Sequence, residues 1–340
     1  MKKGLLSFAL LILFAGLLAG CSTASEEDAS GNKEKIVIGY FPNINHVPAM
    51  VAKDQALFEQ QLGDGTTVEY RTFADGGAFM TALKTGDVDA GLVGPGPAMN
   101  NYTTGADVKI IAGASTGGTV VLAREGVEIN SPEDFAGKVF VTPAVGCTHD
   151  VQYETYLQEA GITSERIGGT MKHMPGKPAT YSALLQSGKV DIAVAPEPWA
   201  AVIQNETGAK VVIPWNEISF GETLPASVMV TSGKLASENP ELVQNIVDAH
   251  KEAIQFIKDN PEEAKAITMK DIEETTGQAL EKEVVDLAWE RIGFTYEVDQ
   301  DAVQAFADSS YALKFLKEKP DFTNLIDKQF INSQKTASKK

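Results

Sequence analysis

The hydrophobic positions from Ile36 onward predict strands that alternate with helices. Short runs rich in apolar and β-branched residues, such as "IVIGYF" and "VDAGLV", precede helical stretches such as "VPAMVAKDQALFEQQLG" and "PAMNNYTTG". This alternation predicts parallel βαβ units and a sheet covered by helices. Beyond Ser232 the pattern is helical, with Pro240 and Pro261 placed where they begin helices. The predicted fold class is therefore α/β with a helical C-terminal segment.

The same design occurs twice along the chain. The segments "LKTGDVDAGLVGPGPA" and "LQSGKVDIAVAPEPWA" share the order of helix, Gly, charged residue, Val-Asp, buried strand and Pro-rich corner. The apolar runs "GGTVVLAREG" and "LPASVMVTSG" follow the two series and suit crossover strands. We therefore expect two α/β lobes joined by two hinge crossovers. Lobe 1 would be discontinuous, with residues 36–119 and 224–332, and lobe 2 would hold residues 120–223.

The first 35 residues predict export and attachment to a membrane. Lys2 and Lys3 precede the apolar segment "GLLSFALLILFAG", which has the form of a signal peptide and is shorter than the ~20 apolar residues of a spanning helix. The sequence "LAGC" looks like the lipobox of bacterial lipoproteins, so we expect removal of residues 1–20 and lipidation of Cys21. Residues 21–35 have the composition of a flexible tether, and residues 333–340 are expected to be disordered.

Charge and cysteine content narrow the partners. The formal net charge of −17 makes the chain a poor partner for nucleic acid. An anionic ligand would have to be held by local donors rather than by the overall field of the protein. Cys147 is the only other cysteine, so lipidation of Cys21 leaves no intrachain disulfide.

Glycine-rich or polar corners follow five of the predicted strands. Ligands of open parallel sheets collect outside the carboxyl ends of the strands. In "GPGPA", Pro97 suits the first turn of a helix, which leaves the N–H groups of Gly96, Ala98 and Met99 free. The other corners offer Asn45 and His46, Ser115 and Thr116, Cys147 with Thr148 and His149, and Glu197 with Trp199. We expect all five corners to face one cleft between the lobes.

Residues 36 to about 230 resemble the solute-binding lipoproteins of ABC importers, in the branch that serves nitrate, aliphatic sulfonates, taurine and the thiamine pyrimidine precursor. The matching segments are "GYFPNINHVPAMVAKDQALFE", "GDVDAGLVGPGPA", "GASTGG", "SPEDFAGK" and "PEPWA". The resemblance implies a type II periplasmic-binding fold whose lobes close over a small molecule. It also implies a monomer on the extracytoplasmic face of a bacterial membrane, with a permease and its ATPase as partners. Many sulfonate-binding relatives have Asn-Thr-Gln where this chain has Cys147-Thr148-His149.

A sulfonate or taurine is the first ligand class that we expect. Helix N-termini favour anions, and several hydrogen bonds to the charged group would be needed for micromolar affinity. The expected donors are the N–H groups of residues 96–99 and the hydroxyls of Ser115, Thr116 and Thr148. Glu197 would pair with an amine such as that of taurine, and Trp199 would form an apolar wall.

Two other ligand classes stay open. A flat heterocycle, such as a pyrimidine or a flavin, would stack on Trp199, Phe41 or Tyr40 and hydrogen-bond to Asn45 and Glu197. A zinc or copper ion would require His46, Cys147 and His149, with His173 nearby in "MKHM", although no pair stands at a recognised metal-ligand spacing.

Catalysis is not expected. The fold also occurs in a thiamine-pyrimidine synthase, but its cysteine-rich segment and its lysine-bound cofactor have no counterpart in this sequence, so we expect no cofactor. Hydrolysis by Cys147 would need a base, and His149, two residues away at a helix start, would point elsewhere.

Overall fold

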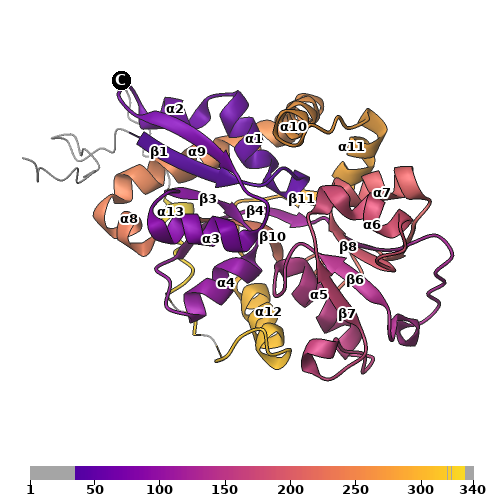
Figure 1. The fold of residues 1–340 in the computed structure, drawn as a ribbon. Coiled ribbons are helices and arrows are strands. Elements are labelled where there is room, and N and C mark those ends of the chain that lie inside the picture. Colours follow the sequence, from indigo (N-terminus) through magenta and orange to yellow (C-terminus); the bar gives the residue numbers. More distant parts are fainter. Residues whose placement is uncertain (1–34, 320, 323, 334–340) are drawn as a thin grey trace, which may run out of the picture.

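Two α/β lobes form the molecule, as the sequence predicts. The computed structural model describes residues 35–319, 321–322 and 324–333. Figure 1 shows one lobe built from the N-terminal and C-terminal thirds of the chain and the other built from the middle third. Within these residues, no helix is both long and apolar enough to cross a membrane. Cys21 and the expected signal peptide lie outside the described residues.

The sheet of the first lobe has six strands in the order β11-β4-β10-β3-β1-β2. Strand β1 pairs in parallel with β2 and β3, whereas β10 runs antiparallel between β3 and β4. The strands are β1 (Lys35–Tyr40), β2 (Thr67–Thr72), β3 (Ala90–Val93), β4 (Lys109–Gly117), β10 (Pro225–Thr231) and β11 (Ile292–Phe294). The chain therefore returns to this sheet after it has built the second lobe.

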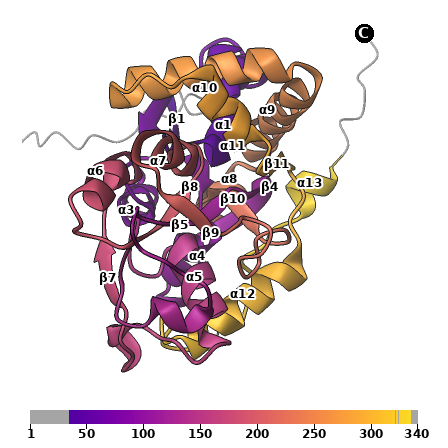
Figure 2. The ribbon, with the colours of Figure 1, turned by 90° about the vertical axis from the view of Figure 1, so that its right-hand side faces the viewer.

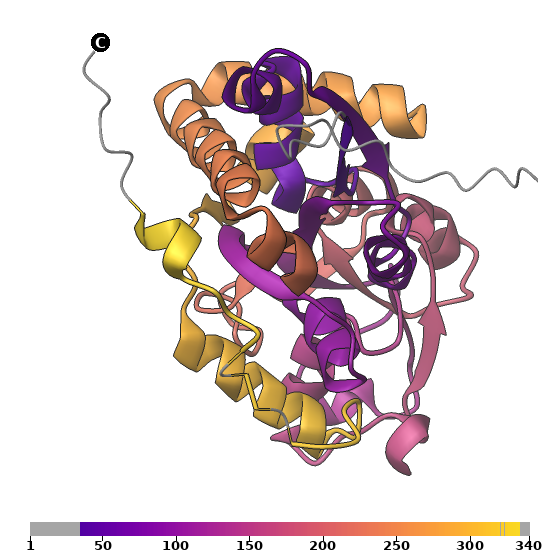
Figure 3. The same ribbon diagram turned by 90° about the vertical axis from the view of Figure 1, so that its left-hand side faces the viewer.

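Helices from both ends of the chain cover the first sheet (Figures 2 and 3). Pro240 begins α9 and Pro261 begins α10, which confirms the prediction from the sequence. Helix α9 packs on α1 and α2, and so joins the C-terminal segment to the N-terminal one. The helices are α1 (Val47–Asp54), α2 (Leu57–Leu62), α3 (Gly76–Thr85), α4 (Pro95–Thr103), α8 (Gly233–Glu238), α9 (Pro240–Asp259), α10 (Pro261–Thr276), α11 (Lys282–Trp289), α12 (Gln300–Ala312) and α13 (Gln329–Asn332), with the 3-10 turn η1 (Ile44–His46).

The second lobe has a five-stranded sheet in the order β7-β6-β8-β5-β9. Its elements are β5 (Thr119–Ala123), η2 (Pro132–Phe135), β6 (Val139–Thr142), α5 (Thr148–Gln158), η3 (Glu165–Ile167), β7 (Lys172–Pro175), η4 (Pro178–Thr180), α6 (Tyr181–Gln186), β8 (Ile192–Pro196), α7 (Trp199–Thr207) and β9 (Lys210–Ile213). Strands β6, β7 and β8 are parallel, and β5 runs antiparallel between β8 and β9.

The chain crosses between the sheets at two consecutive glycines. Gly117 ends β4 and Gly118 precedes β5, and both have positive φ angles, of 76° and 75°. The sequence predicts a polar corner over residues 113–118, and this prediction is wrong because β4 continues to Gly117. Hydrogen bonding to β10 on one side and to β11 on the other keeps these small residues extended.

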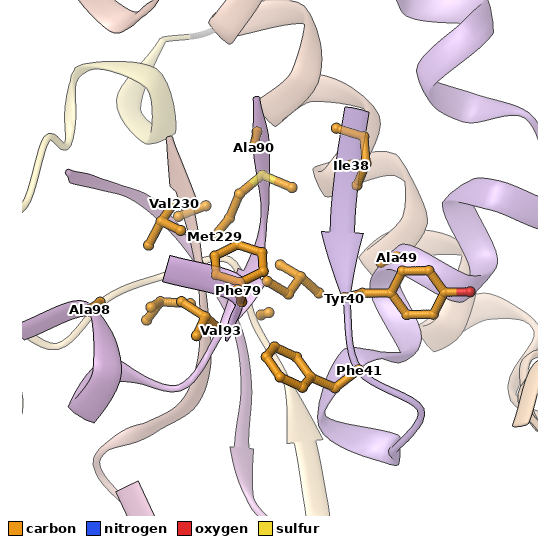
Figure 4. Packing of buried hydrophobic residues seen from close by; sticks show 14 of the residues in the cluster. Ile38, Tyr40, Phe41, Ala49, Phe79, Ala90, Val93, Ala98, Met229 and Val230 are labelled. Carbon is orange, nitrogen blue, oxygen red and sulfur yellow. The ribbon is translucent and has the colours of Figure 1, made fainter. Parts of the chain in front are cut away.

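A large apolar cluster fills the first lobe and reaches the end of β1. Figure 4 shows Phe41 beside Phe79, and their ring centroids are 5.9 Å apart. Tyr40, the residue before Phe41, points toward α1 because successive side chains of a strand face opposite sides. Tyr40 and Phe41 thus place one ring on each face of the sheet. Phe41 lines the cavity described below, and Tyr40 does not.

Candidate functional site

A cavity of about 390 Å³ lies between the two lobes. The residues of the first lobe that line it include Phe41, Asn43, Asn45, His46, Thr72, Phe73, Asp75, Gly94 and Pro97. Those of the second lobe include Pro143, Cys147, Thr148, His149, Lys177, Pro178 and Trp199. Most of these residues directly follow strands β1, β2, β3, β6, β7 and β8. The cavity therefore occupies the carboxyl ends of the parallel strands, where the sequence predicts a ligand site.

Local capping positions the polar residues on each side of the cavity. In the first lobe, the Asn43 side chain accepts a hydrogen bond from the Asn45 N–H at 3.0 Å and so holds the turn η1, which carries Asn45 and His46. In the second lobe, Asp150 Oδ2 accepts a hydrogen bond from the Gly146 N–H at 2.8 Å, which holds the loop in front of α5. His149 lies in the first turn of that helix.

Seven of the residues that the sequence predicts for the site line this cavity. They are Asn45, His46, Pro97, Cys147, Thr148, His149 and Trp199. The other five, Gly96, Ala98, Ser115, Thr116 and Glu197, are not among the residues that line it. Each of these five residues is instead held by hydrogen bonds or strand pairing within the protein.

The Gly-Pro corner joins the two lobes rather than presenting free amides. Helix α4 begins at Pro95, two residues earlier than predicted, and the Gly96 N–H donates to Thr148 Oγ1 at 3.2 Å. The Ala98 N–H donates to the Gly94 carbonyl at 3.4 Å. A Cβ atom on Gly94 would lie 2.5 Å from Thr148 Oγ1. The glycines therefore allow the second lobe to approach this backbone closely.

The hydroxyl donors expected at residues 115 and 116 belong to strand β4. Ser115 is fully buried, and its Oγ donates to the Asn45 carbonyl oxygen at 3.0 Å. Thr116 pairs with Pro225 and Gly293 in the sheet. Ser115 supports the turn that carries Asn45, which is an indirect contribution to the site.

Glu197 forms an ion pair within the protein instead of facing a ligand amine. Its Oε1 lies 2.7 Å from Arg291 Nη1, and its Oε2 accepts the Ala201 N–H at 3.0 Å. Arg291 also donates to Gln204 Oε1 at 2.8 Å. Burial raises the pKa of Glu197, and Arg291 opposes this shift. Because Arg291 precedes β11 and Glu197 follows β8, the pair connects the two lobes.

Three polar atoms on residues that line the cavity are buried and have no hydrogen-bond partner among the described residues. They are Asn45 Oδ1, His46 Nδ1 and His149 Nε2. Buried polar atoms are nearly always hydrogen-bonded to protein, water or ligand. Burial and the neighbouring His149 lower the pKa of His46 to about 3, and burial lowers the pKa of His149 to about 4. Both imidazoles are therefore uncharged at neutral pH and available for hydrogen bonds.

Aromatic side chains form much of the apolar wall. Phe41, Phe73 and Trp199 line the cavity. The ring centroids of Phe41 and His46 are 4.8 Å apart. The prediction that Tyr40 could stack on a ligand is wrong. Tyr40 is buried, and its hydroxyl donates to Asp271 Oδ1 at 2.8 Å, beside the ion pair between Asp271 and Lys53. Alternation along β1 sends Tyr40 to the face opposite Phe41.

The sequence model of the NMT1-like family matches residues 29–270, which is most of the chain. The chain belongs to the NMT1-like family.

Proteins similar to this chain include two binding proteins and a solved structure with the same fold. A putative binding protein of Brucella abortus is 27% identical over 221 residues, which cover 65% of this chain and 66% of that relative. The taurine-binding periplasmic protein of Escherichia coli is 27% identical over 216 residues, which cover 63% of this chain and 64% of that relative. The structure of the alkanesulfonate-binding protein from Xanthomonas axonopodis pv. citri bound to MOPS has a TM-score of 0.74 at 18% identity, covering 87% of this chain and 98% of that one. The periplasmic-binding fold inferred from the sequence is confirmed.

Several lining residues of this NMT1-like chain were missed in the sequence, among them Phe73, Asp75, Lys177 and Thr276. Phe73 and Asp75 follow β2, Lys177 follows β7, and Thr276 ends α10. The strand-end rule that identified the other corners would have found the first three. Asp75 has a second role, because its Oδ1 accepts the Gly77 and Ala78 N–H groups and caps α3. No local signal in the sequence indicates that α10 reaches the cavity.

The described residues do not bring together the ligands that the metal hypothesis needs. Among the described residues, no group of three or more His, Cys, Asp and Glu side chains could hold a metal ion. His173 stacks on Phe140 at 4.6 Å, and its Nε2 lies 2.7 Å from Thr142 Oγ1, so it belongs to the core of the second lobe. Burial raises the pKa of Cys147 to about 12, which keeps its thiol protonated and argues against a nucleophilic role.

Proposed function

We propose that this protein captures a small organic solute in the interlobe cavity, outside the cytoplasm, and delivers it to an ABC importer with a permease and an ATPase. The observation that carries this proposal is the cavity of about 390 Å³, which both lobes line and which holds three buried polar atoms without partners. Its size and largely apolar lining are those of a small-molecule site. The similarity to the taurine-binding protein of Escherichia coli and the alkanesulfonate-binding protein of Xanthomonas supports the same role.

Closure of the lobes on the solute is part of this proposal. Direct contacts already join them, including the hydrogen bond from Asn100 Nδ2 to the Gly146 carbonyl at 2.9 Å. The predicted lobe boundaries are 119/120 and 223/224; the first lies one residue inside β5, next to Gly117 and Gly118, where we place the hinge. Hinged opening would then break the interlobe contacts and leave each sheet intact.

The cavity best suits a flat heterocycle with hydrogen-bonding groups on its edge. Phe41, Phe73 and Trp199 offer faces for stacking. Asn45, His46 and His149 offer hydrogen bonds from both lobes. Two of the donors expected for an anion, the Gly96 N–H and the Ser115 hydroxyl, are used within the protein.

A taurine-like zwitterion is the second candidate. Asp75 and Lys177 line the cavity from opposite lobes and match the ammonium and sulfonate groups of such a ligand. The Escherichia coli relative is a taurine-binding protein. In this hypothesis Asp75 takes the role that the sequence suggested for Glu197.

A thermal-shift screen tests the proposed function. We expect one of four probes to raise the melting temperature: 4-amino-5-hydroxymethyl-2-methylpyrimidine, riboflavin, taurine or ethanesulfonate. A probe at a hundredfold excess over its dissociation constant stabilises the folded state by about 2.7 kcal/mol. Small-angle scattering should show no expansion of the protein when the probe binds. If the free protein is open, binding of the probe should make it more compact. Absence of a shift with all four probes, and with broader libraries of small organic solutes, would contradict solute binding.

Lipid attachment is a separate proposal. The "LAGC" sequence before residue 22 supports lipidation of Cys21, which lies outside the described residues. We expect Cys21→Ser to move the protein from the membrane fraction to the soluble fraction of cells. Cys147→Ser is the matched control, because it removes the other cysteine and should leave the protein in the membrane fraction. Retention of the Cys21→Ser protein in the membrane would refute the anchor.

A further inference from the structure

Two histidines from opposite lobes face the same cavity. His46 belongs to the turn η1 of the first lobe, and His149 belongs to the first turn of α5 in the second lobe. His46 is 4% exposed, and the ring of Phe41 covers one side of it. Each imidazole has a buried nitrogen without a hydrogen-bond partner in the described part of the chain. His46 is therefore buried and His149 partly buried, and the buried nitrogen of each ring has no protein partner among the described residues.

We propose that His46 and His149 are the specificity-determining pair of the cavity, which admits solutes without net negative charge and excludes anionic ones at neutral pH. This inference rests on the proposed function, because it concerns which solutes the cavity takes. It separates taurine, a zwitterion, from simple alkanesulfonates.

The charges around the pair favour this selection. An uncharged imidazole has one N–H donor and one acceptor nitrogen, so it offers an anion a single hydrogen bond and no charge. The other charged or titratable side chains that line the cavity are Asp75 before α3, Cys147 before α5 and Lys177 before η4. Asp75 repels an anion, Cys147 stays a thiol because burial raises its pKa to about 12, and Lys177 is exposed to water.

An anion in this cavity would be poorly compensated. A buried charge needs a paired charge and several hydrogen bonds to offset the loss of its hydration. None of the described residues that line the cavity is an arginine, and exposed Lys177 is weakened as a partner by solvent screening. A zwitterion gains an additional pair between its ammonium group and Asp75, and an uncharged heterocycle needs only hydrogen bonds.

The histidines also determine how affinity depends on pH. Burial in the closed form lowers the pKa of His46 to about 3 and that of His149 to about 4, whereas histidines exposed in an open cleft titrate near 6.5. The closed form therefore binds fewer protons than the open form, so acidification opposes closure. Between pH 7.5 and 5.5, affinity is expected to fall about 100-fold if both rings must lose a proton on closure, and about 10-fold if one must.

Isothermal titration calorimetry on the full chain tests the pair. The probes are taurine, ethanesulfonate and 4-amino-5-hydroxymethyl-2-methylpyrimidine, each at pH 7.5 and 5.5. Taurine and ethanesulfonate form a matched pair, because both carry a sulfonate and only taurine carries an ammonium group. We expect no binding of ethanesulfonate at pH 7.5, and a loss of 10-fold to 100-fold in affinity at pH 5.5 for the taurine or pyrimidine probe that binds.

The double variant His46→Gln/His149→Gln keeps hydrogen-bonding groups but cannot titrate. We expect it to reduce the pH effect on affinity to less than threefold. His173→Gln is the matched control, because His173 is a histidine of the second lobe whose side chain is only 9% exposed and does not line the cavity. This control should keep the pH effect of the original protein. Burial also raises the pKa values of Asp150 and Glu154, but every variant retains these two residues. A pH effect that disappears only in the double variant therefore comes from the histidine pair and not from these carboxyl groups.

Two binding results would overturn the inference. One is ethanesulfonate binding at pH 7.5 with an affinity similar to that of taurine. The other is an unchanged pH effect in the double variant, which would leave solute binding intact as the proposed function. If no probe binds, the proposed solute classes fail, and scattering then decides the histidine pair. The free protein should expand at pH 5.5 and the double variant should not, and equal dimensions in both would refute the pair.

Discussion

Arg291→Ala is expected to destabilise the protein by about 3–5 kcal/mol, because it leaves the carboxylate of Glu197 buried without its partner. Glu197 is fully buried, and the side chain of Arg291 is only 15% exposed. The substitution also removes the hydrogen bond to Gln204. The free energy of unfolding, measured by urea denaturation at pH 7, should fall by this amount, and the melting temperature should fall with it.

A double variant distinguishes the unpaired charge from the loss of packing. Arg291→Met/Glu197→Gln removes both charges and keeps similar volumes, so we expect it to recover much of the lost stability. If Arg291→Ala unfolds at the same urea concentration as the original protein, the ion pair contributes nothing to stability. If the double variant is no better than the single one, packing rather than charge explains the loss.

Trp199→Ala is expected to weaken solute binding at least tenfold and to lower stability by about 3–5 kcal/mol, the usual cost of truncating a buried aromatic residue. Trp199 is 3% exposed, belongs to the apolar core and lines the cavity as the first residue of α7. The substitution therefore opens a void and removes a face for stacking. Affinity should be measured by calorimetry with whichever probe the thermal-shift screen identifies, and stability by denaturation.

Trp289→Ala is the matched control for this change. Trp289 packs on Phe294 at 5.2 Å, at the end of α11, and does not line the cavity. We expect it to lower stability while the affinity of the folded molecules stays the same. Unchanged affinity in folded Trp199→Ala as well would make Trp199 a purely structural residue.

Much of the fold was readable from local patterns in the sequence. Alternating apolar runs and helical stretches predicted two α/β lobes, and Pro240 and Pro261 marked the starts of α9 and α10. These signals are local: a β-branched run favours a strand, and a proline is tolerated in the first helical turn. Strand-end corners likewise located seven lining residues, because parallel strands bring their carboxyl ends to one edge.

The roles of individual residues at those corners depended on contacts between distant segments. The sequence predicts a free N–H group at Gly96, but Thr148 from the second lobe accepts its hydrogen bond. The sequence predicts that Glu197 pairs with a ligand amine, but Arg291, 94 positions later in the chain, pairs with it. The sequence places Ser115 in a polar corner at the end of a predicted strand, yet pairing with β10 and β11 keeps it within β4.

The sequence by itself determined the class of fold, the two-lobed plan and the edge at which the cavity forms, because each follows from short-range periodicity and backbone preferences. Tertiary structure alone decided which donors are satisfied by the opposite lobe and which, like those of His46 and His149, stay without partners in the cavity. Hydrogen-bond satisfaction is a property of the packed molecule, since a group can be recognised as unpaired only after every neighbour is in place.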